Sequence, residues 1–391
     1  MDNLSKLQAL CGVGSADLRA AYANLPKARL GIITAGGFGS GVSEMAGGLN
    51  NYFNELGLFS RWESVNAHGD FLRLSKKITN ALCFFDFRVS AAELERFKDL
   101  AAGLDIDTSY DALYLNDHPA LLAARFCAAK KIFRCHFDIS AANAQVWEFF
   151  KPFIEDCDEI IFTSPRFHKP LKGNISYIAP SIDPCSTKNI FVPREQALKV
   201  LAEFKIPSDK PIITQVGRFD RAKDPSGVIE VFQKVRARIP CTLVLAGGHA
   251  DDDPESETVY EELKRQAGGD KDIFLLAINK EDFKIAALQS ISDVIVQKSL
   301  SESFGLAVTE ALWKAKPVVA SDIGGIPLQI KNGKTGLLCH NIESCALAVL
   351  DLLENKALAM RLGRNGQEFV RENFLITSEL KNHLAVFNKI L

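Results

Sequence analysis

The sequence predicts an α/β protein built from two domains, each a parallel sheet flanked by helices. Its 391 residues are too many for one ordinary core at about 150 residues per domain. Short runs rich in β-branched residues alternate with longer segments of helical period, which is typical of strands joined by crossover helices. The alternation stops once, in residues 181–193, and then restarts, which indicates a domain boundary.

The first half reads as a complete α/β domain. Residues 29–35 (RLGIITA) form a predicted buried strand, GGFGSG at 36–41 a tight turn, and residues 42–56 a helix with one apolar face. Further strands are predicted at 112–115, 131–135, 159–162 and 175–178, and further helices at 91–102, 119–129 and 144–151.

The second half repeats the pattern. The linker SIDPCSTKNIFVP is followed by a strand at 211–217 and a helix at 225–238, which Asp224 is placed to cap and Pro225 to start. Strands recur at 241–246, 272–278, 293–297 and 317–320, and the last residues form a helix that could pack back on the first domain. The predicted divisions are therefore 1–184, 185–372 and 373–391.

The composition excludes several classes of protein. Lys and Arg number 46 against 48 Asp and Glu, a net charge of −2, so no global positive field favours nucleic acid or anionic lipid. No run approaches the roughly 18 apolar residues of a membrane span, and the first residues do not resemble a signal peptide, so we expect a cytoplasmic protein. Nine cysteines without CxxC or zinc spacing predict reduced thiols and no zinc site.

Two loops that follow predicted strands suggest an anion site. In GGFGSG the missing side chains let backbone N–H groups approach a phosphate or a sugar, although the loop fits neither a P-loop nor a dinucleotide fingerprint and a plain tight turn is the alternative. In GRFDRAK, Arg218 and Lys223 follow the strand at 211–217 and can converge on one diphosphate. The alternative for these two residues is solvated surface charge.

Residues 301–310 (SESFGLAVTE) are the most informative segment. Glu302 lies in a predicted loop and Glu310 about two turns into the following helix, so the two carboxylates can accept hydrogen bonds from the vicinal hydroxyls of two polyols. The helix N-terminal N–H groups would face a phosphate between them. A capping acid followed by an exposed helical acid is the alternative.

Acidic and imidazole side chains suggest a second site in the first half. His136 and Asp138 are placed on the same side at the end of the strand 131–135, although a structural histidine is the alternative. Glu44 falls in the first turn after the glycine loop. The run at 251–253 (DDD) looks like a metal-holding DxD, but its Pro- and Glu-rich loop favours a solvated surface, so we expect no metal.

Together, GRFDRAK, ESFGLAVTE and ASDIGGIPLQIKNGKTGLL resemble the retaining glycosyltransferases of family four over about residues 30–375. That resemblance implies the GT-B fold, two Rossmann-like domains facing a central cleft. Within the family, GSGVSEM, FLRLSKKITNAL, FRCHFDIS, APSIDPCSTKN and ITQVGRFD are most similar to the trehalose glycosyltransferring synthases, which join a nucleotide-activated glucose to free glucose.

The resemblance also implies residue roles. Arg218 and Lys223 would bind the donor diphosphate, Glu302 the donor sugar and Glu310 the ribose, while His136 would lie by the reacting anomeric carbon. The remaining donor-binding positions would be Gly39, Ser40, Gly41, Phe304, Gly305 and Leu306, and the acceptor would be held by Glu44, His136 and Asp138. Ser40 departs from the family, where glycine is expected, which puts the conformation of that loop in doubt.

The expected function is retaining transfer of glucose from a nucleotide diphosphate glucose to free glucose, with the nucleotide sugar as substrate and with no cofactor. Trehalose phosphorylase, another family-four transferase with a different soluble acceptor, and a non-catalytic sugar-nucleotide sensor are the alternatives. The expected partners are thus a nucleotide-sugar donor and a small sugar acceptor, and whether the chain forms a homodimer stays open.

Overall fold

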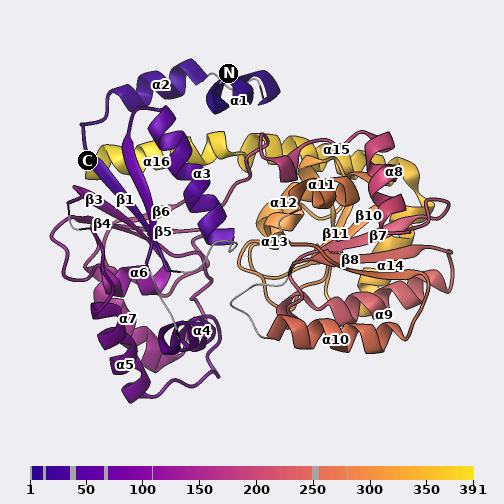
Figure 1. Ribbon diagram of the computed structural model, residues 1–391, viewed down its shortest axis with the longest axis horizontal. Helices are drawn as coiled ribbons and strands as arrows, with labels where there is room; N and C mark the ends of the chain where they lie inside the picture. Colours follow the sequence, from indigo (N-terminus) through magenta and orange to yellow (C-terminus); the bar gives the residue numbers. More distant parts are fainter. Residues whose placement is uncertain are drawn as a thin grey trace. The chain divides into compact units, whose positions relative to one another are not determined.

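The computed structural model describes residues 2–11, 15–35, 41–65, 69–107, 109–248, 255–279 and 281–391. The chain divides into two compact units (Figure 1). Unit 1 comprises Met1–Pro180 and Ile376–Leu391, and unit 2 comprises Ser181–Leu375. Each unit is a six-stranded parallel sheet with flanking helices, so the predicted α/β class is confirmed.

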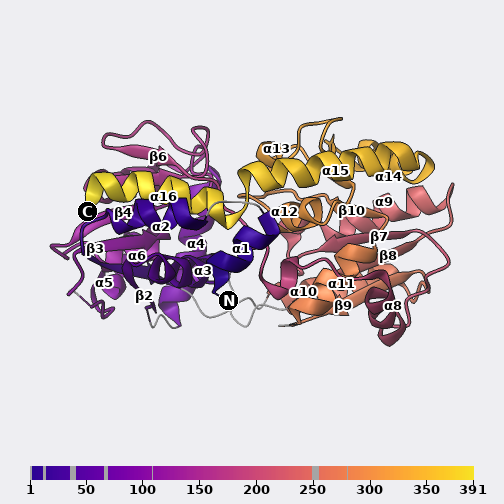
Figure 2. The ribbon, with the colours of Figure 1, turned by 90° about the horizontal axis from the view of Figure 1, so that it is seen from above.

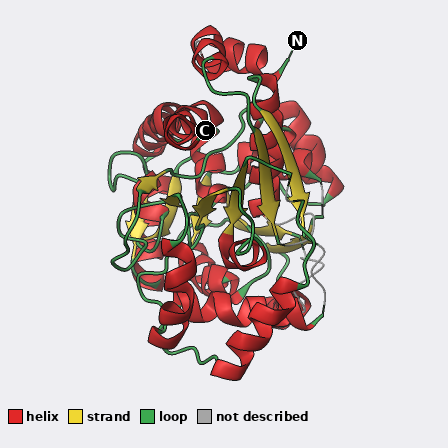
Figure 3. Cartoon of the chain, turned by 90° about the vertical axis from the view of Figure 1, so that its left-hand side faces the viewer, coloured by secondary structure: helices red, strands yellow, loops and turns green. Residues whose placement is uncertain are grey.

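Unit 1 has the strand order β2-β1-β3-β4-β5-β6. Its strands are β1 (Arg29–Thr34), β2 (Phe59–Ser64), β3 (Ala112–Asn116), β4 (Lys130–Arg134), β5 (Glu159–Phe162) and β6 (Ile175–Tyr177). Its helices are α1 (Asn3–Cys11), α2 (Ser15–Ala23), α3 (Gly41–Glu55), α4 (Asp70–Cys83), α5 (Ala91–Ala102), α6 (Asp117–Ala123), α7 (Ala144–Glu155) and α16 (Ile376–Ile390). Figure 3 shows helices on both sides of the strands.

The C-terminal helix α16 packs within unit 1, beside α2 and α3 (Figures 1 and 2). The ring of Phe387 lies edge-on to Phe53 of α3, with centroids 5.1 Å apart. Tyr22 of α2 donates its hydroxyl hydrogen to the carbonyl of Leu380 at 2.8 Å. The last residues of the chain therefore complete the core of the unit that contains its first residues.

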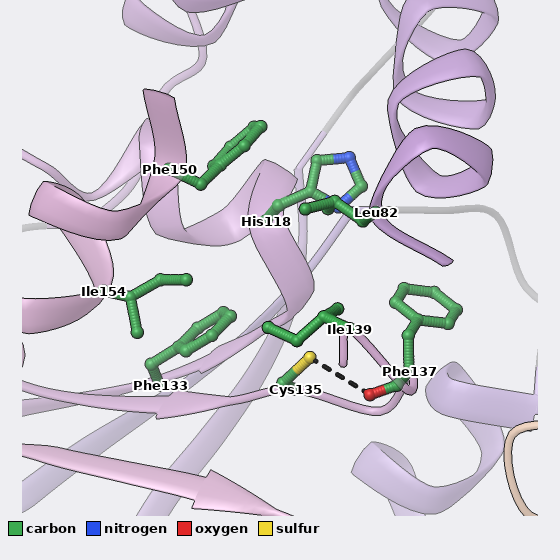
Figure 4. Close-up of a pocket in the computed structure, with 8 residues that line it drawn as sticks. All are labelled: Leu82, His118, Phe133, Cys135, Phe137, Ile139, Phe150 and Ile154. Atoms are coloured by element: carbon green, nitrogen blue, oxygen red, sulfur yellow. Dashed lines mark hydrogen bonds between the residues drawn. The ribbon is translucent and has the colours of Figure 1, made fainter. Parts of the chain in front are cut away.

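The opposite face of this sheet is covered by α4 to α7 and contains a cavity of about 10 Å³ (Figure 4). The rings of His118, Phe133 and Phe150 line it, together with the Cys135 thiol, which donates to the carbonyl of Phe137. This volume is about that of one water probe, so the cavity is too small for a sugar. A substrate site must be sought elsewhere.

Unit 2 has the strand order β12-β11-β10-β7-β8-β9. Its strands are β7 (Ile212–Val216), β8 (Thr242–Gly247), β9 (Ile273–Ala277), β10 (Val294–Gln297), β11 (Val318–Ser321) and β12 (Leu337–Cys339). Its helices are η1 (Thr187–Asn189), α8 (Arg194–Glu203), η2 (Arg221–Lys223), α9 (Pro225–Arg236), α10 (Glu255–Ala267), α11 (Asp282–Ile291), α12 (Leu306–Trp313), α13 (Ile326–Gln329), α14 (Ile342–Glu354) and α15 (Lys356–Asn373).

Some predicted elements require correction. The helix predicted at 119–129 is α6, which begins at Asp117 and ends at Ala123, because turns at Ala124 and Arg125 carry the chain to β4. The elements that the sequence analysis missed include β2, β12, α1, α2, α4 and α8. The predicted cap is confirmed, because the Asp224 carboxylate accepts a hydrogen bond from the amide of Gly227 at 3.0 Å.

Three further findings concern the described ranges as a whole. No helix in them is long and apolar enough to cross a membrane. The eight cysteines whose side chains are described are free thiols. Within the same ranges, no three His, Cys, Asp or Glu side chains are grouped so as to hold a metal ion. The acidic run at 251–253 lies outside them.

Candidate active site

The strand order of unit 2 locates its candidate site. From β7 the chain proceeds outward to β8 and β9, and then returns to place β10 on the other side of β7. Ligands of such sheets bind at the carboxyl ends of the two strands where the order reverses. The loops after β7 and β10, residues 217–224 and 298–305, lie at this switch point, and they carry Arg218, Lys223 and Glu302.

Backbone hydrogen bonds tie these two loops together. The amides of Leu300 and Ser301 both donate to the carbonyl of Ala222, at 2.7 and 3.3 Å. Asp224, in the left-handed conformation at φ 49°, also forms an ion pair with Lys298. The short helix η2 and the β10 loop thus form one structural element, which fixes the side chains that it carries.

The structure brings Lys223 and Glu302 together. The Lys223 ammonium lies 2.5 Å from Oε2 of Glu302, and the two side chains are 21% and 7% exposed. The Ser299 hydroxyl donates to the same oxygen at 3.3 Å. Arg218 is half exposed and lies 3.7 Å from the Asp220 carboxylate. The loops at the switch point therefore carry two separate pairs of opposite charge, Lys223 with Glu302 and Arg218 with Asp220.

The segment after Glu302 depends on glycines. A Cβ on Gly324, whose φ is +51°, would lie 1.7 Å from the carbonyl oxygen of Glu302, so any side chain there would displace the glutamate. Gly305, at φ +89°, precedes α12 and has no side chain to cap it. The chain runs from Phe304 through Gly305 into α12, which begins at Leu306. The first N–H groups of this helix can bind an anion.

Glu310 belongs to a buried polar network. It is the fifth residue of α12, hence little more than one turn into the helix rather than two. The alternative of an exposed acid is wrong, because its side chain is only 3% exposed and its Oε1 lies 2.9 Å from the ammonium of Lys188. Gln289 donates to Oε2 at 3.4 Å and accepts from Lys314 at 2.9 Å. Burial lowers the pKa of Lys314 to about 8, which the charge of Glu310 partly opposes.

Sequence reasoning missed Lys188. It lies on η1, in a segment whose composition predicted an interdomain linker, and the family resemblance noted there assigned this lysine no role. Lys188 and Glu310 are far apart in the sequence, so no motif of fixed spacing could have predicted that they form a pair.

In unit 1, hydrogen bonds determine the state of His136. Asn116 donates its amide hydrogen to the carbonyl of Ile33 at 3.0 Å, so its oxygen is the atom that lies 2.9 Å from Nε2 of His136. Nε2 must therefore carry the hydrogen, and Nδ1 is a bare acceptor. Nδ1 has no hydrogen-bond partner among the described residues.

Charge and burial keep this imidazole neutral. Burial lowers the pKa of His136 well below its usual value, and the charges of Arg134 and His383 lower it further. The His136 amide donates to Asp117 at 2.8 Å. Burial raises the pKa of that carboxyl to about 7, although this hydrogen bond and Arg134 oppose the shift.

The other predicted residues of unit 1 lie in the loop after β4 and at the start of α3. Because β4 ends at Arg134, His136 and Asp138 lie in the following loop rather than on the strand. The Asp138 carboxylate accepts hydrogen bonds from the amide and hydroxyl of Ser140, at 3.0 and 2.6 Å. Glu44 lies in the first turn of α3 and is exposed, and Gly41 begins that helix. Gly39 and Ser40 lie outside the described residues.

Comparison with known proteins covers almost the whole chain. Residues 199–369 match the family model of glycosyl transferases group 1, and residues 32–169 match that of the trehalose synthase N-terminal domain. A trehalose synthase from Rubrobacter xylanophilus is 35% identical, with 96% of this chain and 94% of that protein covered. One from Thermococcus litoralis is 36% identical, with coverages of 90% and 88%.

A solved structure shares the fold. The sucrose-phosphate synthase from Thermosynechococcus elongatus superposes with a TM-score of 0.69 at 20% identity, and the alignment covers 93% of this chain and 99% of that one. This likeness concerns the arrangement of the sheets and helices alone.

Proposed function

The chain belongs to the trehalose synthase family of GT-B glycosyltransferases, and from that membership we propose that it transfers glucose, with retention, from a nucleotide diphosphate glucose to free glucose and forms trehalose. The observation that carries the donor half of this proposal is the Lys223–Glu302 pair at the switch point of unit 2, with Arg218 in the same loop as Lys223. Arg and Lys side chains suit a diphosphate, and a carboxylate can accept hydrogen bonds from sugar hydroxyls.

In the proposed mechanism the bond between the glucosyl carbon and the phosphate weakens while the acceptor hydroxyl approaches from the same side. Negative charge then grows on the leaving diphosphate. Arg218, Lys223 and the first N–H groups of α12 stabilise that charge more in the transition state than in the ground state, and this difference lowers the barrier. Glu302 holds hydroxyls of the donor sugar, and Glu310, fixed by Lys188, holds the ribose.

The acceptor is assigned to unit 1. Nδ1 of His136 is a buried acceptor without a partner among the described residues, and in this proposal an acceptor-sugar hydroxyl that reaches it donates to it. The neutral ring orients this hydroxyl without removing its proton. The leaving phosphate takes the proton, so no separate protein base is required. Asp138 and Glu44 supply further acceptors for a polyhydroxylated sugar, in which each buried unpaired hydroxyl would cost about 1–3 kcal/mol.

We further propose that transfer needs no metal ion, because Arg218 and Lys223 can neutralise the diphosphate. Activity should then survive EDTA. Activity that EDTA abolishes and magnesium restores would contradict this assignment and direct attention to the acidic run at 251–253.

A product assay tests the function. The protein is incubated with UDP-, ADP- or GDP-glucose and free glucose, and NMR should identify an α,α-1,1 disaccharide. A reducing disaccharide, or transfer to another acceptor while glucose stays inert, would overturn the acceptor assignment but not the glycosyltransferase one. Cleavage of trehalose by inorganic phosphate without any nucleotide would favour a phosphorylase, and nucleotide-sugar binding without turnover would favour a sensor.

A further inference from the structure

A groove of about 510 Å³ lies at the edge of the unit 2 sheet opposite the candidate active site. Its floor includes Ile212 at the start of β7, Asp293 just before β10 and Pro317 just before β11. The candidate site follows the other ends of β7 and β10. Strands of four or five residues, at about 3.3 Å per residue, separate the two places by roughly 15 Å. The volume is within the range of small-molecule sites.

The groove carries an excess of positive charge. Arg194, Lys210, Lys316 and Lys356 line it, against the carboxylates of Asp209 and Asp293. Lys210 is paired with Asp272 at 2.7 Å, and the Asp293 carboxylate accepts from the amide of Ile212 at 2.8 Å. Arg194, Lys316 and Lys356 form no salt bridge with any described carboxylate.

Arg194 and Lys316 lie close enough to repel each other. Burial lowers the pKa of Lys316, the Asp293 carboxylate partly opposes this, and the guanidinium of Arg194 lowers it further. The Lys316 ammonium donates one hydrogen bond, to the carbonyl of Ser292 at 3.1 Å, and so keeps two donors unused. An anion bound between these two cations would relieve their repulsion and use those donors.

The facing part of the groove is apolar. Leu352, Leu353 and Ala359 line it at the junction of α14 and α15, together with Met360, which is 58% exposed. A bare inorganic anion would leave this surface in water. A ligand with both a charged and an apolar part would contact both parts of the groove.

We propose that this groove binds an organic phosphate, with the phosphate group between Arg194 and Lys316 and the carbon skeleton against Leu353 and Met360. The site is distinct from the proposed donor and acceptor positions, and it does not depend on the proposed reaction. Occupation would join α8, the turn before β11 and the start of α15, and so would stabilise unit 2.

Phenyl phosphate is the probe, because it has one ring and one phosphate and resembles neither a nucleotide nor a sugar. Isothermal titration should show saturable binding to the whole protein, and inorganic phosphate should bind more weakly. Arg194→Ala should raise the Kd for phenyl phosphate at least tenfold, as expected for loss of a charge-assisted hydrogen bond. Lys316→Met should do the same, and Met360→Ser should weaken phenyl phosphate but not inorganic phosphate.

Lys199→Ala is the matched control. Lys199 lies on the same helix as Arg194, is 73% exposed and pairs with Glu195, so its removal changes the net charge equally without touching the groove. Its Kd should equal that of the unmodified protein. Equal weakening by Arg194→Ala and Lys199→Ala, no binding of phenyl phosphate, or its displacement by UDP would each overturn the proposal. Because Arg194 is exposed, its variant tests the site even if Lys316→Met fails to fold.

Discussion

Replacing Lys223 should separate the stabilising role of its ion pair from its proposed role at the diphosphate. Lys223→Met leaves the Glu302 carboxylate, which is only 7% exposed, with Ser299 as its one remaining side-chain partner among the described residues. Breaking a buried ion pair costs about 3–5 kcal/mol, and the partial exposure of Lys223 favours the lower figure. For a unit of this size, about 3 kcal/mol lowers the Tm by roughly 6–12 °C.

The second variant, Lys223→Met with Glu302→Gln, removes the stranded charge. The neutral amide keeps the shape of the side chain, so calorimetry should show that most of the lost Tm returns. The kcat, measured at 25 °C where both variants are folded, should stay about 10²-fold or more below that of the unmodified enzyme, because the leaving diphosphate still lacks the Lys223 cation and keeps only Arg218.

Arg236→Met is the matched control. Arg236 forms an ion pair with Asp270 at 2.5 Å, on α9 of the same unit, and the two side chains are 32% and 22% exposed. Its loss should lower the Tm while kcat stays unchanged. If kcat recovers together with the Tm in the double variant, Lys223 serves to neutralise Glu302 and the diphosphate role is refuted. An unchanged kcat with a higher KM would instead mean equal binding in ground and transition states.

Replacements at three other positions have defined outcomes in kinetic or Tm measurements. Lys188→Met should raise the KM for the nucleotide sugar about tenfold with a smaller effect on kcat, because Glu310 loses its ion-pair partner, and a normal KM would remove Lys188 from the donor site. In the folded protein Asp117 has a pKa of about 7 against 3.8 in the unfolded chain, so the folded state binds the extra proton and loses up to about 4 kcal/mol as the pH rises from 4 to 7. Asp117→Asn should abolish that component of the pH dependence of Tm, and an identical Tm profile would show that the carboxyl is not buried in this way. Asp138→Ala should raise the KM for glucose more than that for the nucleotide sugar, and Asp138→Asn, which retains an acceptor for Ser140, should show how much of this effect comes from the loop.

The sequence predicted the fold where burial dictates composition. β1, β7 and β10 are buried almost throughout, so their β-branched runs are nearly continuous. By contrast, β2 (FSRWES) is an edge strand with one fully buried residue. Its polar residues interrupt the apolar pattern by which the other strands were predicted. β12 has three residues and is too short to show a period. The apolar stretch after Pro119 suggested a long helix because periodicity alone does not reveal where a helix ends.

The candidate site was predictable only as positions along the chain. GRFDRAK and SESFGLAVTE each follow a strand, so their place at one end of the sheet could be inferred before the structure was known. The partners of these residues could not be inferred, because the ion pairs Lys223–Glu302 and Lys188–Glu310 join residues far apart in sequence. The state of His136 likewise depends on Asn116, the last residue of β3, whose orientation is fixed by the carbonyl of Ile33.

The pairing of the two loops has a consequence for the proposed catalysis. The hydrogen bonds from Leu300 and Ser301 to the Ala222 carbonyl hold together the two loops that carry Lys223 and Glu302. A cation fixed in advance need not reorganise when charge develops on the leaving diphosphate, and a site that avoids this reorganisation stabilises the transition state more than water can. The adjacent carboxylate reduces the attraction of Lys223 for a bound diphosphate in the ground state. As charge grows on the leaving group, that attraction increases. If the residues have the proposed roles, the ion pair therefore makes Lys223 contribute less to donor binding in the ground state and more to kcat.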